Sequence, residues 1–483
     1  MRRKSCLAAL SLVGVSCASL TGHSVFSGGS NNRERPVRRV TEAGPPGRPS
    51  LVSEATLGTV SVRKWRLGNG LEVILMPDGA ATSVAVMTWF RVGSRHENAA
   101  AGETGLAHLF EHLMFTQTTS ATAAGEFDRR MEEAGASTNA MTSYDFTAYI
   151  DEVPPEALSL ALHMEADRMV NLALRDEQVD TEREVVTEER LGSVDDSVDG
   201  TIDELLFGKA FRTHPYRFPI IGRMEDIKAV TREKATRFYQ TFYAPNNAVL
   251  VVTGRFDPDE VLTEVNAQYG PIAASELPKD AIAPERGAAA PFRHELERPV
   301  AADRLAIGFP APALGDVDRA AFEVIDEILT GGPSARLHRR LVTDAQIASS
   351  VDGGATPTKD PSLFTLWVQM RRGQKAEAAE ALINEELDRV LTKPVADADL
   401  DKAKNRIETS FWRGLTSSEG RANQLGEFDV VTGDYRKLFQ RADEIRAVTA
   451  ADVERVAKLY LAGNTRGVIV ARPKATPRGQ GGR

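Results

Sequence analysis

Cysteine is nearly absent from this 483-residue chain, and long apolar runs are absent altogether. Both cysteines, Cys6 and Cys17, lie within the first 17 residues, so the rest of the chain forms no disulfide and offers no thiolate to a metal. No apolar run approaches the ~20 residues that a membrane-spanning helix needs. The formal net charge is −9, and the body of the chain carries no basic patch interleaved with aromatic residues. These features argue against nucleic acid as a partner.

Histidine is also scarce, yet two of the eight histidines stand four residues apart in His108-Leu109-Phe110-Glu111-His112. Residues at this spacing project from one face of a helix, about one turn apart, so both imidazoles can reach one metal ion. Glu111 lies beside them, where it could accept a proton from water. The order H-x-x-E-H is a metallopeptidase signature. A helix with polar residues turned to the solvent is the alternative, but the apolar flanks oppose it because buried histidines need partners.

The third ligand of such a site has to come from elsewhere, since catalytic zinc usually takes three protein ligands. The acidic segment 180–190 is the best candidate. Within it Glu182, Val186 and Glu189 follow one another along a single helical stripe. A charge-rich helix is most often a solvated surface, and spacing alone does not choose between Glu188 and Glu189.

The first nineteen residues are typical of an export signal. Residues 2–4 are basic, residues 6–15 are mostly apolar, and small residues follow. Gly14-Val15-Ser16-Cys17 resembles a lipoprotein cleavage box, although leucine is usual where Gly14 stands. Lipidation of Cys17 and plain cleavage near Ala18 are the two alternatives. We therefore expect an exported protein, periplasmic or anchored to the outer membrane of a bacterium.

The remaining chain divides by composition. Residues 20–57 are rich in Gly, Ser, Pro and Arg, and we expect a flexible tether there. Residues 58–272 show alternating strand patterns, the metal-site helix and further helices. A stretch rich in Pro, Ala and Glu at residues 273–295 is the expected linker to a second domain, residues 296–473. We expect residues 474–483 to be a disordered tail.

The second domain weakly repeats the order of the first. The segment 304–309 reads as a strand and 318–329 as the matching helix. Aligned on the metal-site helix, that helix has only carboxylates where the first has its two histidines and its glutamate, namely Glu323, Asp326 and Glu327. We infer an α+β fold of two homologous domains, each a mainly antiparallel or mixed sheet packed by helices, related by internal duplication. Two unrelated α+β domains are the alternative.

From residue 60 to residue 472 the chain resembles the pitrilysin family of inverted-motif zinc peptidases, which includes insulin-degrading enzyme and mitochondrial processing peptidase. Beyond the metal-site helix, the resemblance rests on Val92-Gly93-Ser94-Arg95, Thr138-Asn139-Ala140, His214-Pro215-Tyr216 and Tyr243-Ala244-Pro245-Asn246-Asn247. In that family the third ligand is a glutamate preceded by a valine three positions earlier, which implies Glu189. A further glutamate seven positions before it, Glu182, resembles the family's auxiliary acidic residue.

The resemblance implies a zinc-dependent endopeptidase that hydrolyses unfolded or short peptides with one Zn²⁺ per chain. Manganese or cobalt are alternatives that affinity order does not exclude. Asn139 and Ala140 resemble the family's substrate-binding edge, where an extended peptide adds as an extra strand. The implied catalytic residues are Glu111 as general base and Glu182, and the implied metal ligands are His108, His112 and Glu189.

One departure from the family bears on partners. Relatives carry an arginine and a tyrosine in the second half that bind substrate; here Arg413 and Arg421 are available, but Phe428, the nearest aromatic residue after Arg421, has no hydroxyl. Some bacterial relatives pair an H-x-x-E-H subunit with a separate Arg/Tyr subunit. We therefore expect a homodimer or, preferably, a heterodimer with such a paralogous subunit. A non-catalytic assembly subunit and a zinc-binding chaperone or peptide-binding lipoprotein are the alternatives from other functional classes.

Overall fold

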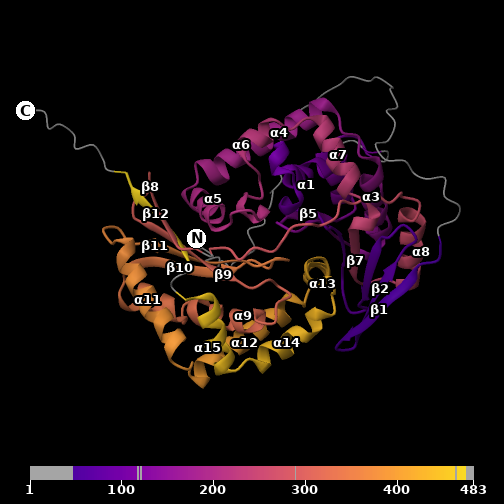
Figure 1. The fold of residues 1–483 in the computed structure, drawn as a ribbon. Helices are drawn as coiled ribbons and strands as arrows, with labels where there is room; N and C mark the ends of the chain where they lie inside the picture. The colour runs from indigo at the N-terminus through magenta and orange to yellow at the C-terminus, as the bar shows by residue number, and fades with distance from the viewer. Residues whose placement is uncertain (1–46, 117–118, 120–121, 289, 463–464, 475–483) are drawn as a thin grey trace, which may run out of the picture. The chain divides into compact units, whose positions relative to one another are not determined.

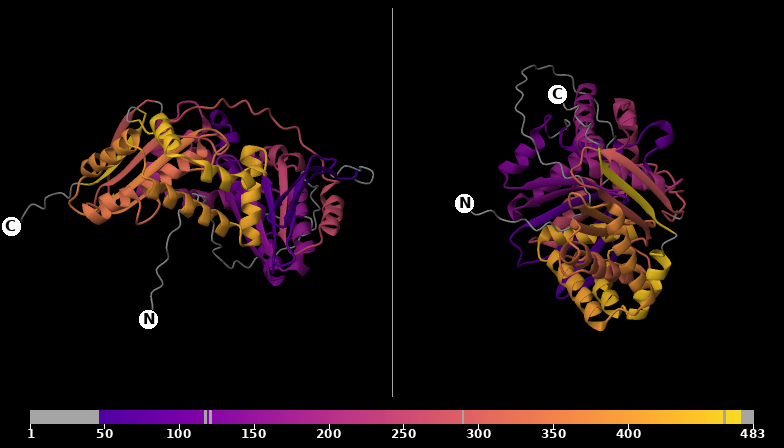
Figure 2. Two further views of the ribbon diagram at one scale, coloured as in Figure 1. Left: turned by 90° about the horizontal axis from the view of Figure 1, so that it is seen from below. Right: turned by 90° about the vertical axis from the view of Figure 1, so that its left-hand side faces the viewer.

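The computed structural model describes residues 47–116, 119, 122–288, 290–462 and 465–474. The expected export signal, both cysteines, residues 20–46 of the expected tether and residues 475–483 lie outside the described residues. Two compact units make up the described chain (Figures 1 and 2). Unit 1 takes the described part of Met1–Glu188 together with Ile220–Ala281 and Trp412–Phe439, and unit 2 takes the remainder.

Unit 1 is built on a seven-stranded mixed sheet. The β3–β7 pair is parallel and the other neighbouring pairs are antiparallel. The central strands are continuous apolar runs that are buried along their whole length, as expected for strands covered on both faces. In sheet order the strands are β1 (Ser50–Leu57), β2 (Val60–Arg66), β3 (Glu72–Pro77), β7 (Ala248–Gly254), β4 (Val84–Phe90), β6 (Thr147–Val153) and β5 (Ser137–Thr142).

Strand β1 corrects the sequence analysis, which placed its residues in a flexible tether. Leu57 pairs with Val60 across the two-residue turn Gly58-Thr59, and Gly58 has the positive φ, 62°, that such a tight hairpin turn requires. β1 is an edge strand whose Leu51 side chain is 50% exposed, so it buries little apolar surface. Main-chain pairing with β2, which composition does not reveal, orders this segment. The tether prediction is therefore wrong for residues 50–57.

Helices cover both faces of this sheet. On one face the Thr88 hydroxyl of β4 bonds Glu165 of α3, and on the other Trp89 packs against Gly426 of α13. A Cβ added at Gly426 would lie 2.1 Å from Trp89 Nε1, so glycine permits this close approach. The helices of unit 1 are α1 (Leu106–Thr116), α2 (Glu126–Glu133), α3 (Leu158–Asn171), α4 (Asp176–Arg190), α6 (Met224–Lys228), α7 (Arg232–Phe242), α8 (Pro258–Tyr269) and α13 (Ser418–Thr432).

Unit 2 repeats this architecture on a five-stranded sheet in the order β10 (Ala348–Ala355), β11 (Ser362–Met370), β9 (Arg304–Ala311), β12 (Gly467–Pro473) and β8 (Phe292–Arg298). β8 begins inside the stretch expected to be a linker. One face of β9 presents Leu305, Ile307 and Phe309 to a core shared with α9 (Arg319–Thr330), α11 (Ala376–Thr392) and α15 (Ala450–Tyr460). On the opposite face Gly308 contacts Leu206 of α5 (Val198–Ala210). Figure 1 shows α5 across this sheet from α9 and α15.

Each unit takes one helix from the other half of the sequence: α13 packs in unit 1 and α5 packs in unit 2. Both helices begin in the same way, because the N-cap hydroxyls of Ser197 and Ser417 accept the N–H of a glycine three residues later, at 3.1 and 3.0 Å. A Cβ added at either glycine, Gly200 or Gly420, would lie 2.1 Å from a backbone carbonyl oxygen. This shared start is a repeat signal additional to the strand order.

The α+β fold of two homologous domains is thus confirmed. The boundaries along the chain, 58–272 and 296–473, concern the repeats rather than the packing units and stay predictions. Three further helices are α10 (Arg336–His338), which belongs to unit 2, and α12 (Asp397–Gly414) and α14 (Lys437–Ala447), within which the chain passes from one unit to the other. Among the described residues, no helix combines the length and apolar character that a bilayer span requires.

Candidate metal centre

The helix that carries both histidines, α1, is fixed at its N-terminus. Glu97 accepts hydrogen bonds from the N–H groups of Gly105 and Ala107, each at 2.8 Å, and so satisfies donors that the first helical turn leaves unpaired. Burial raises the pKa of Glu97 to about 8, although the two N–H donors act in the opposite sense. Gly105 has φ +92°, and a Cβ there would lie 2.5 Å from the carbonyl oxygen of Ile221. The backbone therefore meets α1 too closely for any residue but glycine.

The body of α1 is buried among aromatic side chains. The Tyr149 hydroxyl donates to the carbonyl oxygen of Phe110 at 2.8 Å, and the Phe110 and Tyr243 rings lie 4.8 Å apart. Polar residues share this burial: His108 is 1% exposed, Glu111 3% and His112 7%. The solvent-facing alternative for the H-x-x-E-H helix is thus wrong, because its polar residues face the protein interior.

The second helix of the site, α4, settles the choice that spacing left open. Val186 is fully buried and turns its stripe of α4 inward, whereas Glu188 is exposed. Glu189 lies one residue further on, and its carboxylate meets the two histidines. The division between the two units falls within the last turn of this continuous helix, between Glu188 and Glu189.

His108, His112 and Glu189 bring one ligand atom each within 4.8 Å of one another. The two imidazole rings have centroids 5.1 Å apart. Two imidazole nitrogens and one carboxylate oxygen form a donor set that zinc uses in catalytic sites, with a coordination position left for water or substrate. The residues present therefore fit a zinc ion. Among the described residues, this is the one group of three such side chains close enough to share an ion.

Glu182, which was expected to assist catalysis, lies behind His112. Its Oε2 is 3.5 Å from His112 Nδ1, and Glu182 as a whole residue is 9% exposed. Carboxylates in this position fix the tautomer and orientation of a metal-binding imidazole. Glu182 thus acts through His112 in this geometry, and a direct part in catalysis stays a prediction.

Glu111 has a partner that the sequence analysis did not identify. The hydroxyl of Thr142, the last residue of β5, donates to Glu111 Oε2 at 2.7 Å, and Thr142 is 2% exposed. The available signal was its position two residues after Ala140, which places both side chains on the same face of the strand.

The expected substrate edge, Asn139 and Ala140, lies on β5, which is the last strand of its sheet. Asn139 Oδ1 accepts the N–H of Ala140 at 2.9 Å. That N–H is therefore turned away from the neighbouring strand β6 and toward the sheet edge, where a docked strand would meet it.

Of the two arginines considered above as substrate contacts, Arg421 has other partners and Arg413 lies on the surface. Arg421 contacts Asp78 and donates to the carbonyl oxygen of Leu415 at 2.8 Å, which anchors the start of α13 within unit 1. Arg413 is exposed at the end of α12, and Phe428 is 9% exposed on α13. Phe428, which lacks the hydroxyl that a tyrosine would have, therefore lies at a buried position.

In unit 2 the helix α9 holds its carboxylates in ion pairs. Glu323 contacts the guanidinium groups of Arg319 and Arg441, and Glu327 contacts Arg406. The two arginines hold the pKa of Glu323 below its usual value despite burial. Arginine side chains supply the positive charge at this place in the repeat.

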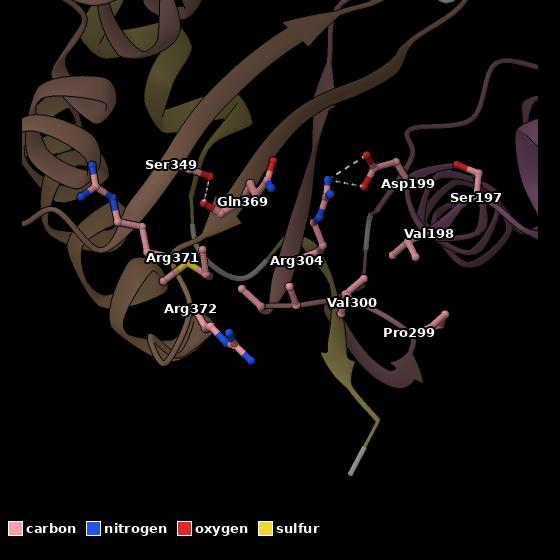
Figure 3. A pocket seen from close by; sticks show the side chains of 13 residues that line it. Ser197, Val198, Asp199, Pro299, Val300, Arg304, Ser349, Gln369, Arg371 and Arg372 are labelled. Atoms are coloured by element: carbon pink, nitrogen blue, oxygen red, sulfur yellow. Dashed lines mark hydrogen bonds and ion pairs between the residues drawn. The ribbon is translucent and has the colours of Figure 1, made fainter. Parts of the chain in front are cut away.

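A surface hollow of about 630 Å³ in unit 2 is unrelated to the metal cluster (Figure 3). Arg304 is bonded to both carboxylate oxygens of Asp199, at 2.9 and 3.1 Å, and Ser349 donates to the carbonyl oxygen of Gln369 at 3.1 Å. Arg371 and Arg372, which also line the hollow, point away from each other in Figure 3. Because the polar side chains of the hollow do not converge on a common point, we assign the hollow no part in the site.

Comparison with known proteins agrees with a metal site formed by two histidines and a glutamate. The family described as "Insulinase (Peptidase family M16)" matches residues 72–223, and "Peptidase M16 inactive domain" matches residues 229–407. The zinc protease PqqE of Helicobacter pylori is 29% identical over 418 residues, 84% of this chain and 92% of its own length. A crystal structure of a protease from Helicobacter pylori has a TM-score of 0.81 at 28% identity, covering 85% of this chain and 99% of that one.

A third protein shows the same fold at low identity. The structure of a peptidase M16 inactive domain from Pseudomonas fluorescens has a TM-score of 0.78 at 17% identity, over 86% of this chain and 98% of that one. The first family match contains the histidine pair and Glu189, and the second contains α9. The chain belongs to peptidase family M16, the pitrilysin family.

Proposed function

We propose that this chain is a zinc-dependent endopeptidase that hydrolyses unfolded or short peptides. The observation that carries the proposal is the convergence of two buried histidines, His108 and His112, with the half-buried Glu189, beside Glu111, which precedes His112 in the chain. The family and the name of the Helicobacter pylori relative, a zinc protease, support the same activity.

His108, His112 and Glu189 would hold the ion, one per chain. When bound, zinc supplies Lewis-acid activation of water and of the scissile carbonyl group. Glu111 accepts the proton of the attacking water and returns it to the leaving amine, as a general base and then a general acid. Glu182 holds the ring of His112, and the burial of Glu111 keeps bulk water from competing for its carboxylate.

Substrate selection follows from the sheet edge. A peptide adding to β5 would bond the Ala140 N–H in place of the Asn139 side chain. Only an extended, unpaired segment can bond in this way, because folded proteins rarely offer free main-chain donors and acceptors. This favours unfolded or short peptides as substrates.

A specific observation favours a partner-dependent form of this function. Arg421 is already committed to Asp78 and Leu415, and the Phe428 ring has no hydroxyl to donate. A second subunit that bears an arginine and a tyrosine would supply the missing substrate contacts. We therefore propose a dimer, preferably a heterodimer with such a paralogous subunit, over a homodimer.

The export signal expected at residues 1–19 extends the proposal to location. We propose that the chain is exported to the periplasm and, if Cys17 is lipidated, anchored to the outer membrane.

The test is hydrolysis of a mixed pool of unfolded peptides by the full chain, with products identified by mass spectrometry. We expect cleavage at internal bonds that stops when a chelator removes the metal and returns with stoichiometric zinc. Cleavage only after a co-expressed Arg/Tyr paralogue is added would establish the partner-dependent form. Stoichiometric zinc with tight peptide binding and no cleavage in either case would show a binding protein and end the proposal.

A further inference from the structure

The contact between Thr142 and Glu111 joins two functions that are otherwise on separate elements. Glu111 belongs to α1, the helix of the histidines, and Thr142 ends β5, the edge strand expected to receive the peptide. Their side chains meet in a hydrogen bond of 2.7 Å, with both residues 3% exposed or less. Donation by a hydroxyl to a carboxylate is a charge-assisted bond and among the stronger ones in proteins.

This bond fixes the part of Glu111 that proton transfer depends on. The terminal torsion of a glutamate is broad, so its two oxygens exchange places readily unless a partner holds one of them. Thr142 holds Oε2, and the orientation of Oε1 is set with it. A general base has to lie within hydrogen-bond reach of the proton it accepts, and an error of about 1 Å in placement costs up to about 100-fold in rate.

The same strand also sets the position of the substrate. Ala140 and Thr142 are two residues apart on β5, so Ala140 offers its main chain to the edge while Thr142 holds the base from the inner face. A strand rises about 3.3 Å per residue. One rigid strand of known register thus spans the distance between the docked main chain and the base.

We propose that Thr142 is a positioning residue for Glu111, through which strand β5 fixes the general base relative to the bound peptide. This inference rests on the proposed peptidase function and names the residue that makes its base effective. Because Thr142 acts through Glu111, removing its hydroxyl should lower turnover and leave zinc in place.

The test compares three variants of the full chain. Thr142→Val keeps the shape and removes the hydroxyl, Thr142→Ser restores the hydroxyl, and Thr88→Val is the matched control. Thr88 makes an equivalent buried bond of 2.7 Å to a carboxylate, that of Glu165, away from the metal cluster. Thr142→Val should lower kcat about 10- to 100-fold, the equivalent of one hydrogen bond to a charged group, with KM changed less than about twofold.

Thr142→Ser should recover kcat to within about threefold of wild type, and Thr88→Val should lose thermal stability but keep the kcat of the folded protein. Zinc affinity, measured by competition with a chromophoric chelator, should be unchanged in all three. An unchanged kcat in Thr142→Val, or an equal loss in Thr88→Val, overturns the inference while the peptidase function stands. If the wild type itself cleaves nothing, crystal structures of zinc-loaded wild type and Thr142→Val still decide: an undisplaced Glu111 carboxylate refutes the positioning role.

Discussion

Helices α1 and α9 hold corresponding places in the two repeats, but their polar side chains find charge partners in different ways. On α1 the polar positions are two histidines and a glutamate that converge with Glu189 on one point. On α9 they are three carboxylates, two of which are paired with arginines of α9 itself or of other segments of unit 2. The first arrangement gathers electron-pair donors that an added cation can join, and the second already contains its cations.

The two helices therefore contribute differently to the fold: α1 supplies residues of the metal site, and α9 contributes packing alone. Each helix follows an interior strand of its sheet along the chain, β4 or β9, and buries most of its apolar side chains. Burying a carboxylate without a partner is costly, so a helix that loses its metal has to gain positive charge from the protein or lose its carboxylates. Arg319 and Arg441 do the former, and the fold survives without a metal.

The largest effect is expected from replacing a carboxylic acid by its amide at equivalent positions of the two helices. Glu111→Gln should lower kcat about 10²- to 10⁴-fold, because the amide cannot accept the proton, while zinc stays bound. Asp326→Asn, the equivalent change on α9, should leave kcat within about twofold. Peptide hydrolysis and zinc content measured on both variants check this, and equal losses in the two would show that α9 takes part in turnover.

A second prediction compares a carboxylate that contacts a histidine of α1, Glu182, with a carboxylate on α9, Glu327. Glu182→Gln weakens the hold on His112 Nδ1, and we expect zinc affinity to fall about 10- to 100-fold, as for other partners of metal-binding imidazoles. Glu327→Gln loses an ion pair with Arg406 and should not change zinc affinity. Chelator competition titrations give both values. Unchanged affinity in Glu182→Gln would leave that glutamate free for the direct catalytic role expected from the family.

The exchanged helices α5 and α13 allow the repeats to be compared without any metal. Gly200→Ala and Gly420→Ala each place a Cβ 2.1 Å from a backbone carbonyl oxygen, and each should destabilise its own unit by about 1–3 kcal/mol. Gly208→Ala in α5 is the control, since its Cβ meets only Arg217 O at 3.6 Å and alanine favours a helix. Urea unfolding monitored in each unit should show comparable losses for the first two variants. A large difference between them would mean that the two helix starts are not equivalent.

The local patterns of the sequence predicted much of this structure. Alternation predicted strands within residues 58–272 and at 304–309, the place of β9, and helical spacing placed the histidines and Glu111 on one buried face. Alternation did not predict β8, which begins inside the expected linker, or β10. Spacing did not choose between Glu188 and Glu189, because adjacent residues differ by only 100° around a helix; burial of Val186 in the folded protein makes the choice. Resemblance to a family, rather than spacing, had selected Glu189.

What the sequence did not predict depends on partners distant along the chain. β1 is ordered by pairing with β2 and buries little, so its composition resembles that of a linker. Each of α5 and α13 packs in the unit formed mainly by the other half of the sequence. Two similar sheets are available to each helix, and no local sequence pattern indicates which of them it will cover. Thr142 was missed because a threonine in a strand is usual, and only the fold brings it to Glu111.

The smallest expected effect is the pH dependence of α9. Burial raises the pKa of Asp326 to about 6, with Thr330, Arg319, Glu323 and Glu327 as its charged and polar neighbours. Since the folded pKa lies above the unfolded one, the stability that protonated Asp326 contributes is complete below about pH 4 and is lost as pH rises through 6. Asp326→Asn cannot ionise, so its stability relative to wild type should rise by about 1–2 kcal/mol between pH 4.5 and 7.5. Urea unfolding at both pH values measures this change. If the difference in free energy of unfolding between the two proteins stayed constant with pH, Arg319 and Arg441 would compensate the charge of Asp326 as fully as they compensate that of Glu323. The carboxylates of α9 would then be as completely neutralised by arginine as the ligands of α1 would be by zinc.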